Sequence, residues 1–170
     1  MFEVFIKRIA CLLVSLFPAL WGMFSFFNNV SDFKETAENA VAPLLSMQDT
    51  YGVPGETWRA ITASWSSTAG LTAITIIETS AGVLASIGIL IMLCSLWGRY
   101  ETFAKGKVLA MIGALAAIMV WGVGFMVVAG DWFMAWQAKS NPLATQLGAM
   151  IYTVPCFLAL IVLMLHREEW

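Results

Sequence analysis

The chain has 170 residues, of which 60% are apolar and only 12% are charged, and its formal net charge is −2. Soluble domains have roughly 45–50% apolar and about 25% charged residues, and a domain this small could not bury the excess. The slight negative charge and the scattered Lys and Arg residues exclude the basic surface expected of a nucleic-acid-binding protein.

Four apolar stretches are long enough to cross a membrane as helices. They cover about residues 6–27, 70–97, 108–129 and 143–165. Crossing a hydrocarbon layer of about 30 Å takes roughly 20 helical residues, and a helix satisfies its own backbone hydrogen bonds there. We therefore predict an all-α fold with one domain over residues 1–170. This fold is an integral membrane four-helix bundle with an external loop at about 28–69.

The first stretch has the basic start of a signal peptide, in Lys7 and Arg8. Its apolar run is longer than the core of such a peptide. It also ends in Phe26-Phe27-Asn28-Asn29, which lacks the small residues of a cleavage site. We expect it to remain as a transmembrane helix that is kinked at Pro18.

The loop at 28–69 carries the pattern of two short helices. Ser31 is a plausible N-cap for the first, in which apolar residues share one face until Pro43 interrupts it. Those residues are Phe33, Ala37, Ala40, Val41, Leu44 and Leu45. Residues 51–55 read as a turn, and residues 56–64 could form the second helix. We expect these pieces to cap the bundle rather than lie on the lipid surface.

Glu78 is the residue that departs most from the apolar pattern of the second stretch. A carboxylate in hydrocarbon costs at least about 2.5 kcal/mol, so it usually faces the bundle interior or a water-filled cavity. Helix counting at 1.5 Å per residue puts it about 12 Å below the external edge, near the level of Trp121 and Tyr152. A hydrogen-bonded cluster of these three side chains is therefore possible. Structural pairing is one interpretation, and proton handling or ligand binding is the other.

A second group of polar and aromatic residues lies at the predicted external interface. It consists of Trp58, Asp131, Trp132, Trp136 and Gln137. Trp is enriched at this level in most membrane proteins, so an aromatic belt explains the group without a site. Head-group binding is the alternative. Arg59 could reach down to Glu78 or pair with Asp131, and we include it with Glu78 in the candidate intramembrane site.

Basic residues flank the four stretches unevenly. One side would hold Lys7, Arg8, Arg99, Lys105, Lys107 and Arg167, and the other Lys34, Arg59 and Lys139. Positive charge marks the cytoplasmic side of membrane proteins. The count of six against three predicts that both termini face the cytoplasm.

The sequence offers little for metal or redox chemistry. Cys11, Cys94 and Cys156 lie inside apolar runs, where thiols behave as small hydrophobes, so we predict neither a disulfide nor a metal site. His166 is the only histidine, and a transmembrane haem commonly needs a pair of such ligands. No nucleophile lies near a base in a recognisable pattern. We therefore expect no cofactor, no catalytic residue and no enzymatic activity.

Three segments carry a resemblance to a known family. They are Trp58-Arg59-Ala60-Ile61-Thr62, Glu78, and the run from Gly124 to Gln137. These residues resemble an uncharacterised bacterial family of predicted small integral membrane proteins, domain of unknown function 2165. The chain departs from the family pattern at Ala129-Gly130-Asp131, where the family has Gly-Gly-Glu. It also exchanges Met134 with Ala135 and lacks a Trp-Asn-Gly-Gln element near Asn141.

The resemblance implies a four-helix protein of the bacterial inner membrane and supplies no activity. Three functional hypotheses fit the sequence. The first is an accessory or structural subunit whose partners are other membrane proteins or further copies of itself. The second is a small proton-coupled transporter or channel-like homo-oligomer that uses Glu78. The third is a lipid- or quinone-binding membrane protein. In all three the lipid bilayer surrounds the chain.

Overall fold

Four long helices form the body of the protein. The computed structural model describes residues 2–139 and 141–168. The helices are α1 (Phe2–Ser31), α5 (Ser66–Cys94), α6 (Tyr100–Ile118) continued by η2 (Met119–Trp132), and α7 (Ala144–Leu165). Each of the four is long and apolar enough to span a membrane. The described residues form no strand, so the predicted all-α transmembrane bundle is confirmed.

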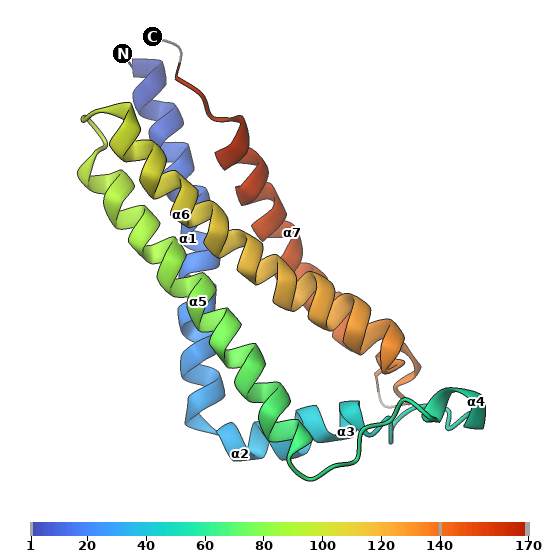
Figure 1. Cartoon of the computed structure of the whole chain (residues 1–170). Coiled ribbons are helices and arrows are strands. Elements are labelled where there is room, and N and C mark those ends of the chain that lie inside the picture. The colour runs from blue at the N-terminus through green and yellow to red at the C-terminus, as the bar shows by residue number, and fades with distance from the viewer. Residues whose placement is uncertain (1, 140, 169–170) are drawn as a thin grey trace.

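The helices run between two distinct ends, which Figure 1 shows. The start of α1, the turn between α5 and α6 and the end of α7 lie together, and we call this the terminal end. The opposite end carries the short helices between α1 and α5 and the connection from η2 to α7, and we call it the loop end. The helices extend slightly beyond most of the predicted stretches, and α5 is shifted to Ser66–Cys94 from the predicted 70–97.

Glycines bring neighbouring helices into backbone contact. A Cβ atom built on Gly22 of α1 would lie 2.5 Å from the backbone nitrogen of Gly82 in α5. Gly88 and Gly106 pack α5 against α6 in the same way, since each would clash with the carbonyl oxygen of the other. Small residues allow such close helix packing where apolar lipid supplies no driving force between helices. These glycines are therefore used in contacts between helices of the same chain.

The loop end contains four short helical segments, of which the first three form one stepped helix. α2 (Phe33–Thr36), η1 (Ala37–Val41) and α3 (Ala42–Leu45) follow one another, and α4 (Pro54–Thr57) comes after a turn. Ala37 and Val41 are buried against Leu71 of α5. The apolar face of the loop thus packs on the bundle, as the capping interpretation expected.

Two local predictions for this loop were wrong. Ser31 is the last residue of α1, and its hydroxyl donates a hydrogen bond to the Phe27 carbonyl instead of capping a new helix. The second helix covers only Pro54–Thr57 rather than 56–64. Pro54 supplies the fixed φ of a first helical position, which places the start of this helix earlier than the turn pattern suggested.

Candidate functional site

Glu78 is buried in the bundle, with 1% of its surface exposed. Its carboxylate oxygen Oε2 accepts a hydrogen bond of 2.7 Å from Nδ2 of Asn29, near the end of α1. Asn29 was not predicted as a site residue. Its position among Phe27, Asn28 and Val30 resembles an ordinary helix end, and only the packing of α1 on α5 brings it to the carboxylate.

A cavity of about 470 Å³ lies next to Glu78 at the loop end of the bundle. Its walls come from the end of α1, the stepped helix, α5 and η2, and they are mostly apolar. The polar groups that line it include Glu78, Asn29, Thr36 and Trp121. Binding pockets for small molecules have this composition, with apolar walls and a few polar groups that orient the ligand.

Trp121 and Tyr152, which were predicted to lie near the level of Glu78, meet in an aromatic cluster with Trp21. The Trp121 and Tyr152 ring centroids are 4.7 Å apart, and Trp21 lies 4.9 Å from Tyr152. Trp121 also stacks on Phe125 at 4.4 Å. The Nε1 atom of Trp121 is buried and has no hydrogen-bond partner among the described residues. Trp121 and Tyr152 thus contact each other, and the hydrogen bond to Glu78 comes from Asn29.

Arg59 lies away from Glu78, at the loop end. Its Nε atom donates to the Glu56 carbonyl at 3.1 Å, and its guanidinium lies 5.4 Å from the centre of the Trp132 ring. One further contact, of 3.5 Å, reaches the backbone oxygen of Asp131. The structure therefore places Arg59 with the interface residues rather than with the intramembrane carboxylate.

Gln137 is the best anchored of the predicted interface residues. It lies in η3 (Ala135–Gln137), with 2% of its surface exposed. Its Nε2 donates to the Glu56 carboxylate at 2.9 Å, and its Oε1 accepts from the Tyr51 backbone N–H at 3.2 Å. Since both partners belong to the long loop, Gln137 joins this loop to the end of the third span.

Aromatic pairs make the same connection beside Gln137. Trp58 meets Trp132 edge-on, with ring centroids 5.7 Å apart, and Tyr51 meets Trp136 at 6.0 Å. The Asp131 side chain is exposed nearby. These contacts bring the predicted interface residues to one place, where they hold the loop against η2 and η3.

A second buried polar cluster lies at the terminal end and was not predicted. Arg8 donates from Nη1 to the carbonyls of Ser95, Leu96 and Gly98, each at 2.9 Å, and so caps the end of α5. Its Nε and Nη2 atoms bind both carboxylate oxygens of Glu168, at 2.7 and 2.8 Å. The sequence places Arg8 and Glu168 160 positions apart, so no local pattern could pair them.

His166 and Lys107 complete this cluster. Lys107 Nζ donates to the His166 carbonyl at 2.7 Å. Burial lowers the pKa of the His166 imidazole, and the hydrogen bonds from Arg8 lower the pKa of the Glu168 carboxyl. The network ties the segment after α7 to α1, α5 and α6, which is a structural role.

Metal-binding clusters are not found in residues 2–139 and 141–168, where no three His, Cys, Asp or Glu residues gather closely enough. The three cysteines are free thiols, and Cys94 is exposed on its helix while Cys11 and Cys156 are buried. The polar groups in the wall of the cavity include the Glu78 carboxyl with Asn29 and the Trp121 indole.

Four membrane-length helices around a buried carboxylate define the class of this molecule: it is a small integral membrane protein with a four-helix transmembrane bundle. The chain belongs to the family described as predicted small integral membrane protein (DUF2165), whose model matches residues 7–166. Neither a curated protein nor a solved structure shows significant similarity to it.

Proposed function

We propose that this protein binds one amphipathic, membrane-soluble small molecule, of the lipid or quinone type, in the cavity beside Glu78. The observation that carries the proposal is the cavity itself, about 470 Å³ with mostly apolar walls. A ligand with an apolar body can fill such a space from the bilayer without a large change in its surroundings.

The polar groups in the wall define the head of this ligand. The Glu78 carboxyl accepts a single hydrogen bond among the described residues, so it retains acceptor capacity. Trp121 Nε1–H is a donor that the described chain does not use. Leaving a buried donor unpaired costs about 1–3 kcal/mol, and a ligand oxygen would remove that cost. A head with both a hydroxyl donor and an oxygen acceptor suits this pair.

Extraction of small molecules from protein purified in mild detergent tests the proposal. We expect wild-type protein to carry one amphipathic compound in near-stoichiometric amount. Glu78→Leu should lose most of it while remaining folded, because leucine suits the apolar surroundings. Ser80→Leu is the matched control, since Ser80 lies on α5 but is exposed. Equal recovery from both variants, or no compound in the wild type, would count against the proposal.

The accessory-subunit hypothesis loses one of its supports. Small residues such as Gly82 and Gly113 are typical of contacts between transmembrane helices of different subunits, but both glycines pack against helices of the same chain. A transporter with Arg59 as the partner of Glu78 is likewise less favoured, because Arg59 contacts Glu56 and Trp132. A stoichiometric protein partner in the same purification would favour the subunit role instead.

The location and orientation of the protein belong to the same proposal. Six of the nine basic residues lie at or near the terminal end, namely Lys7, Arg8, Arg99, Lys105, Lys107 and Arg167. Basic residues mark the cytoplasmic side of membrane proteins. We infer that both termini lie in the cytoplasm, and we propose a bacterial inner membrane because the family resemblance implies one. Reporter fusions at each terminus test this orientation. A reporter that is active only in the cytoplasm should be active at both termini.

A further inference from the structure

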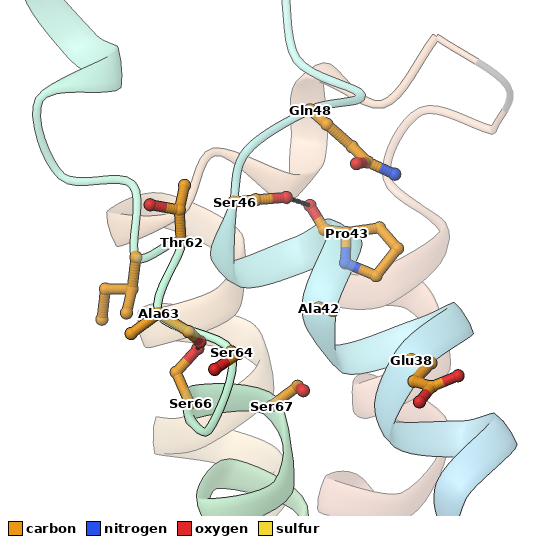
Figure 2. A pocket seen from close by; sticks show the side chains of 11 residues that line it. Glu38, Ala42, Pro43, Ser46, Gln48, Thr62, Ala63, Ser64, Ser66 and Ser67 are labelled. Atoms are coloured by element: carbon orange, nitrogen blue, oxygen red, sulfur yellow. Dashed lines mark hydrogen bonds between the residues drawn. The ribbon is translucent and has the colours of Figure 1, made fainter.

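A second pocket, of about 300 Å³, lies at the loop end between residues 38–48 and residues 61–67 (Figure 2). It shares no described lining residue with the cavity beside Glu78. Its walls are rich in hydroxyl groups, with Ser46, Thr62, Ser64, Ser66 and Ser67 among them. Its size lies at the lower end of pockets that hold small organic ligands.

One wall of this pocket is the first turn of α5. Helix α5 has 29 residues, and its N-terminus carries a partial positive charge from the aligned peptide dipoles. The preceding residue, Trp65, makes no side-chain cap, and the Ser66 N–H donates to the Ala63 carbonyl. The N–H groups of Ser67 and Thr68 remain in the first turn to bind a ligand. A helix start of this kind favours a phosphate or another anion.

Ser67 is a second and independent indication of a ligand. The residue is buried, with 7% of its surface exposed, and its hydroxyl has no hydrogen-bond partner among the described residues. In Figure 2 this hydroxyl points to the side of the pocket where Ala42 and Glu38 lie. By contrast, Ser66 donates to the Ala63 carbonyl and Ser46 to the Pro43 carbonyl.

Glu38 gives the pocket a negative end opposite the start of α5. It is the only acidic or basic residue that lines this pocket in the described chain. Its contact with Lys34 is a long one, 3.9 Å, between exposed side chains, and such pairs are weak. The pocket therefore offers a site for an anion at one end and a site for a cation at the other.

The pocket lies at the level where lipid head groups are found. Trp65, directly before α5, and Trp58 are each 70% exposed. Tryptophans of this kind sit at the membrane–water interface. A group bound at the first turn of α5 would share that level.

We propose that this pocket binds a phosphate ester bearing a primary ammonium group, the phosphoethanolamine head of a membrane phospholipid. The phosphate accepts hydrogen bonds from the Ser67 hydroxyl and the first turn of α5. The ammonium pairs with Glu38. A phosphate lipid without the amine would face Glu38 uncompensated, which gives the pocket its selectivity.

Native mass spectrometry of the purified chain, titrated with lipids of matched acyl chains, tests the assignment. We expect phosphatidylethanolamine to bind about tenfold more tightly than phosphatidylglycerol, because phosphatidylglycerol lacks the ammonium group and so loses one charged hydrogen bond to Glu38. Ser67→Ala should weaken phosphatidylethanolamine binding by about tenfold. Ser80→Ala, an exposed hydroxyl on the same helix, should leave it unchanged.

Glu38→Gln tests the other end of the pocket. It should abolish the preference for phosphatidylethanolamine over phosphatidylglycerol, whereas Glu35→Gln on the neighbouring turn should preserve it. Undiminished binding by Ser67→Ala, or an undiminished preference in Glu38→Gln, would overturn the proposal. Soluble phosphoethanolamine that binds as tightly as the lipid would overturn the assignment to a membrane source.

This inference stands apart from the ligand proposed beside Glu78. Glu78→Leu should abolish the co-purifying compound and leave phosphatidylethanolamine binding intact. Ser67→Ala should weaken phosphatidylethanolamine binding and leave the co-purifying compound in place. The two proposals can therefore fail separately.

Discussion

Asn29 is the partner through which the first helix stabilises the buried carboxyl of Glu78. Its amide donates at 2.7 Å from near the end of α1. A polar group buried without a partner costs free energy in a low-dielectric interior. The pair is therefore expected to contribute to the stability of the loop end as well as to shape the cavity.

Asn29→Ala should lower the free energy of unfolding in detergent micelles by about 1–3 kcal/mol, because it leaves the Glu78 carboxyl without its donor. Asn28→Ala is the matched control. Asn28 is exposed, and its replacement should change stability by no more than about 0.5 kcal/mol. Equal effects of the two substitutions would show that the hydrogen bond does not stabilise the bundle.

The ion pair of Arg8 with Glu168 is the other residue-scale contact with a large expected effect. Both side chains are almost fully buried, and the carboxylate is bound in a bidentate manner. Removing one partner of a buried pair typically costs about 3–5 kcal/mol, because the other charge remains buried. We expect Glu168→Gln to approach this loss. Glu101→Gln, which breaks an exposed pair with Arg99, should cost less than about 1 kcal/mol.

The same cluster predicts how stability depends on pH. The pKa of Glu168 lies below its ordinary 4.5 because Arg8 binds the carboxylate, and the pKa of His166 lies below 6.5 because of burial. Both groups bind protons more weakly when folded, so their contributions are complete above the ordinary values and are lost on acidification. The free energy of unfolding should fall below pH 6.5 and again below pH 4.5. Glu168→Gln should remove the second decrease.

At the residue scale, the sequence drew attention to one residue of each contact but did not identify its partner. Glu78 was identifiable because a carboxylate is rare in an apolar run. Its partner Asn29 was not, because an asparagine at a helix end has many ordinary roles. Arg8 was assigned to a basic flank. Its pairing with Glu168 depends on how the two ends of the chain meet in space, which no local spacing records.

At the scale of the elements, close backbone contact decides how α5 packs. A Cβ on Gly82 would lie 2.6 Å from the backbone nitrogen of Met23, so α1 and α5 would have to separate. Gly82 of α5 therefore points inward, against α1. Which helix it meets could not be predicted, because glycines on several stretches offer similar faces.

Gly82→Ala should therefore lower the free energy of unfolding by about 1–3 kcal/mol, the usual cost of overpacking. Gly148→Ala is the control, since a Cβ at Gly148 would meet nothing within 4 Å. That variant should be neutral or slightly stabilised, because alanine favours a helix over glycine. Denaturant titration of both proteins in the same detergent measures the difference. Similar losses in both would contradict the packing described for α1 and α5.

The loop helices show where element prediction failed. The apolar positions at 33–45 predicted a helix, because their spacing matches one face. The boundary at Ser31 was wrong, since α1 continues through that residue. The helix predicted at 56–64 was wrong over most of its length, because α4 ends at Thr57 and the Ile61 N–H donates to the Leu45 carbonyl at 2.8 Å instead of to a carbonyl four residues earlier. Such contacts arise from tertiary structure and override local preference.

On the scale of the whole molecule, composition and hydropathy were sufficient to predict the bundle. Only helices of roughly 20 apolar residues satisfy their backbone in lipid, so four such stretches leave few other folds. The cavity beside Glu78 could not be predicted in this way. It forms where α1, the stepped helix, α5 and η2 meet, and its volume depends on side chains from all four.

The central claim is that this cavity holds one ligand, and the mass of the intact protein released from mild detergent tests it most directly. Gly124→Leu fills the cavity wall, and a Cβ there makes only an ordinary contact of 3.7 Å with the Met119 carbonyl. Gly148→Leu adds the same side chain in open space. We predict one bound small molecule on wild-type protein and on Gly148→Leu, and none on Gly124→Leu. A wild-type mass equal to that of the bare chain, or the same bound mass in all three proteins, would contradict the account.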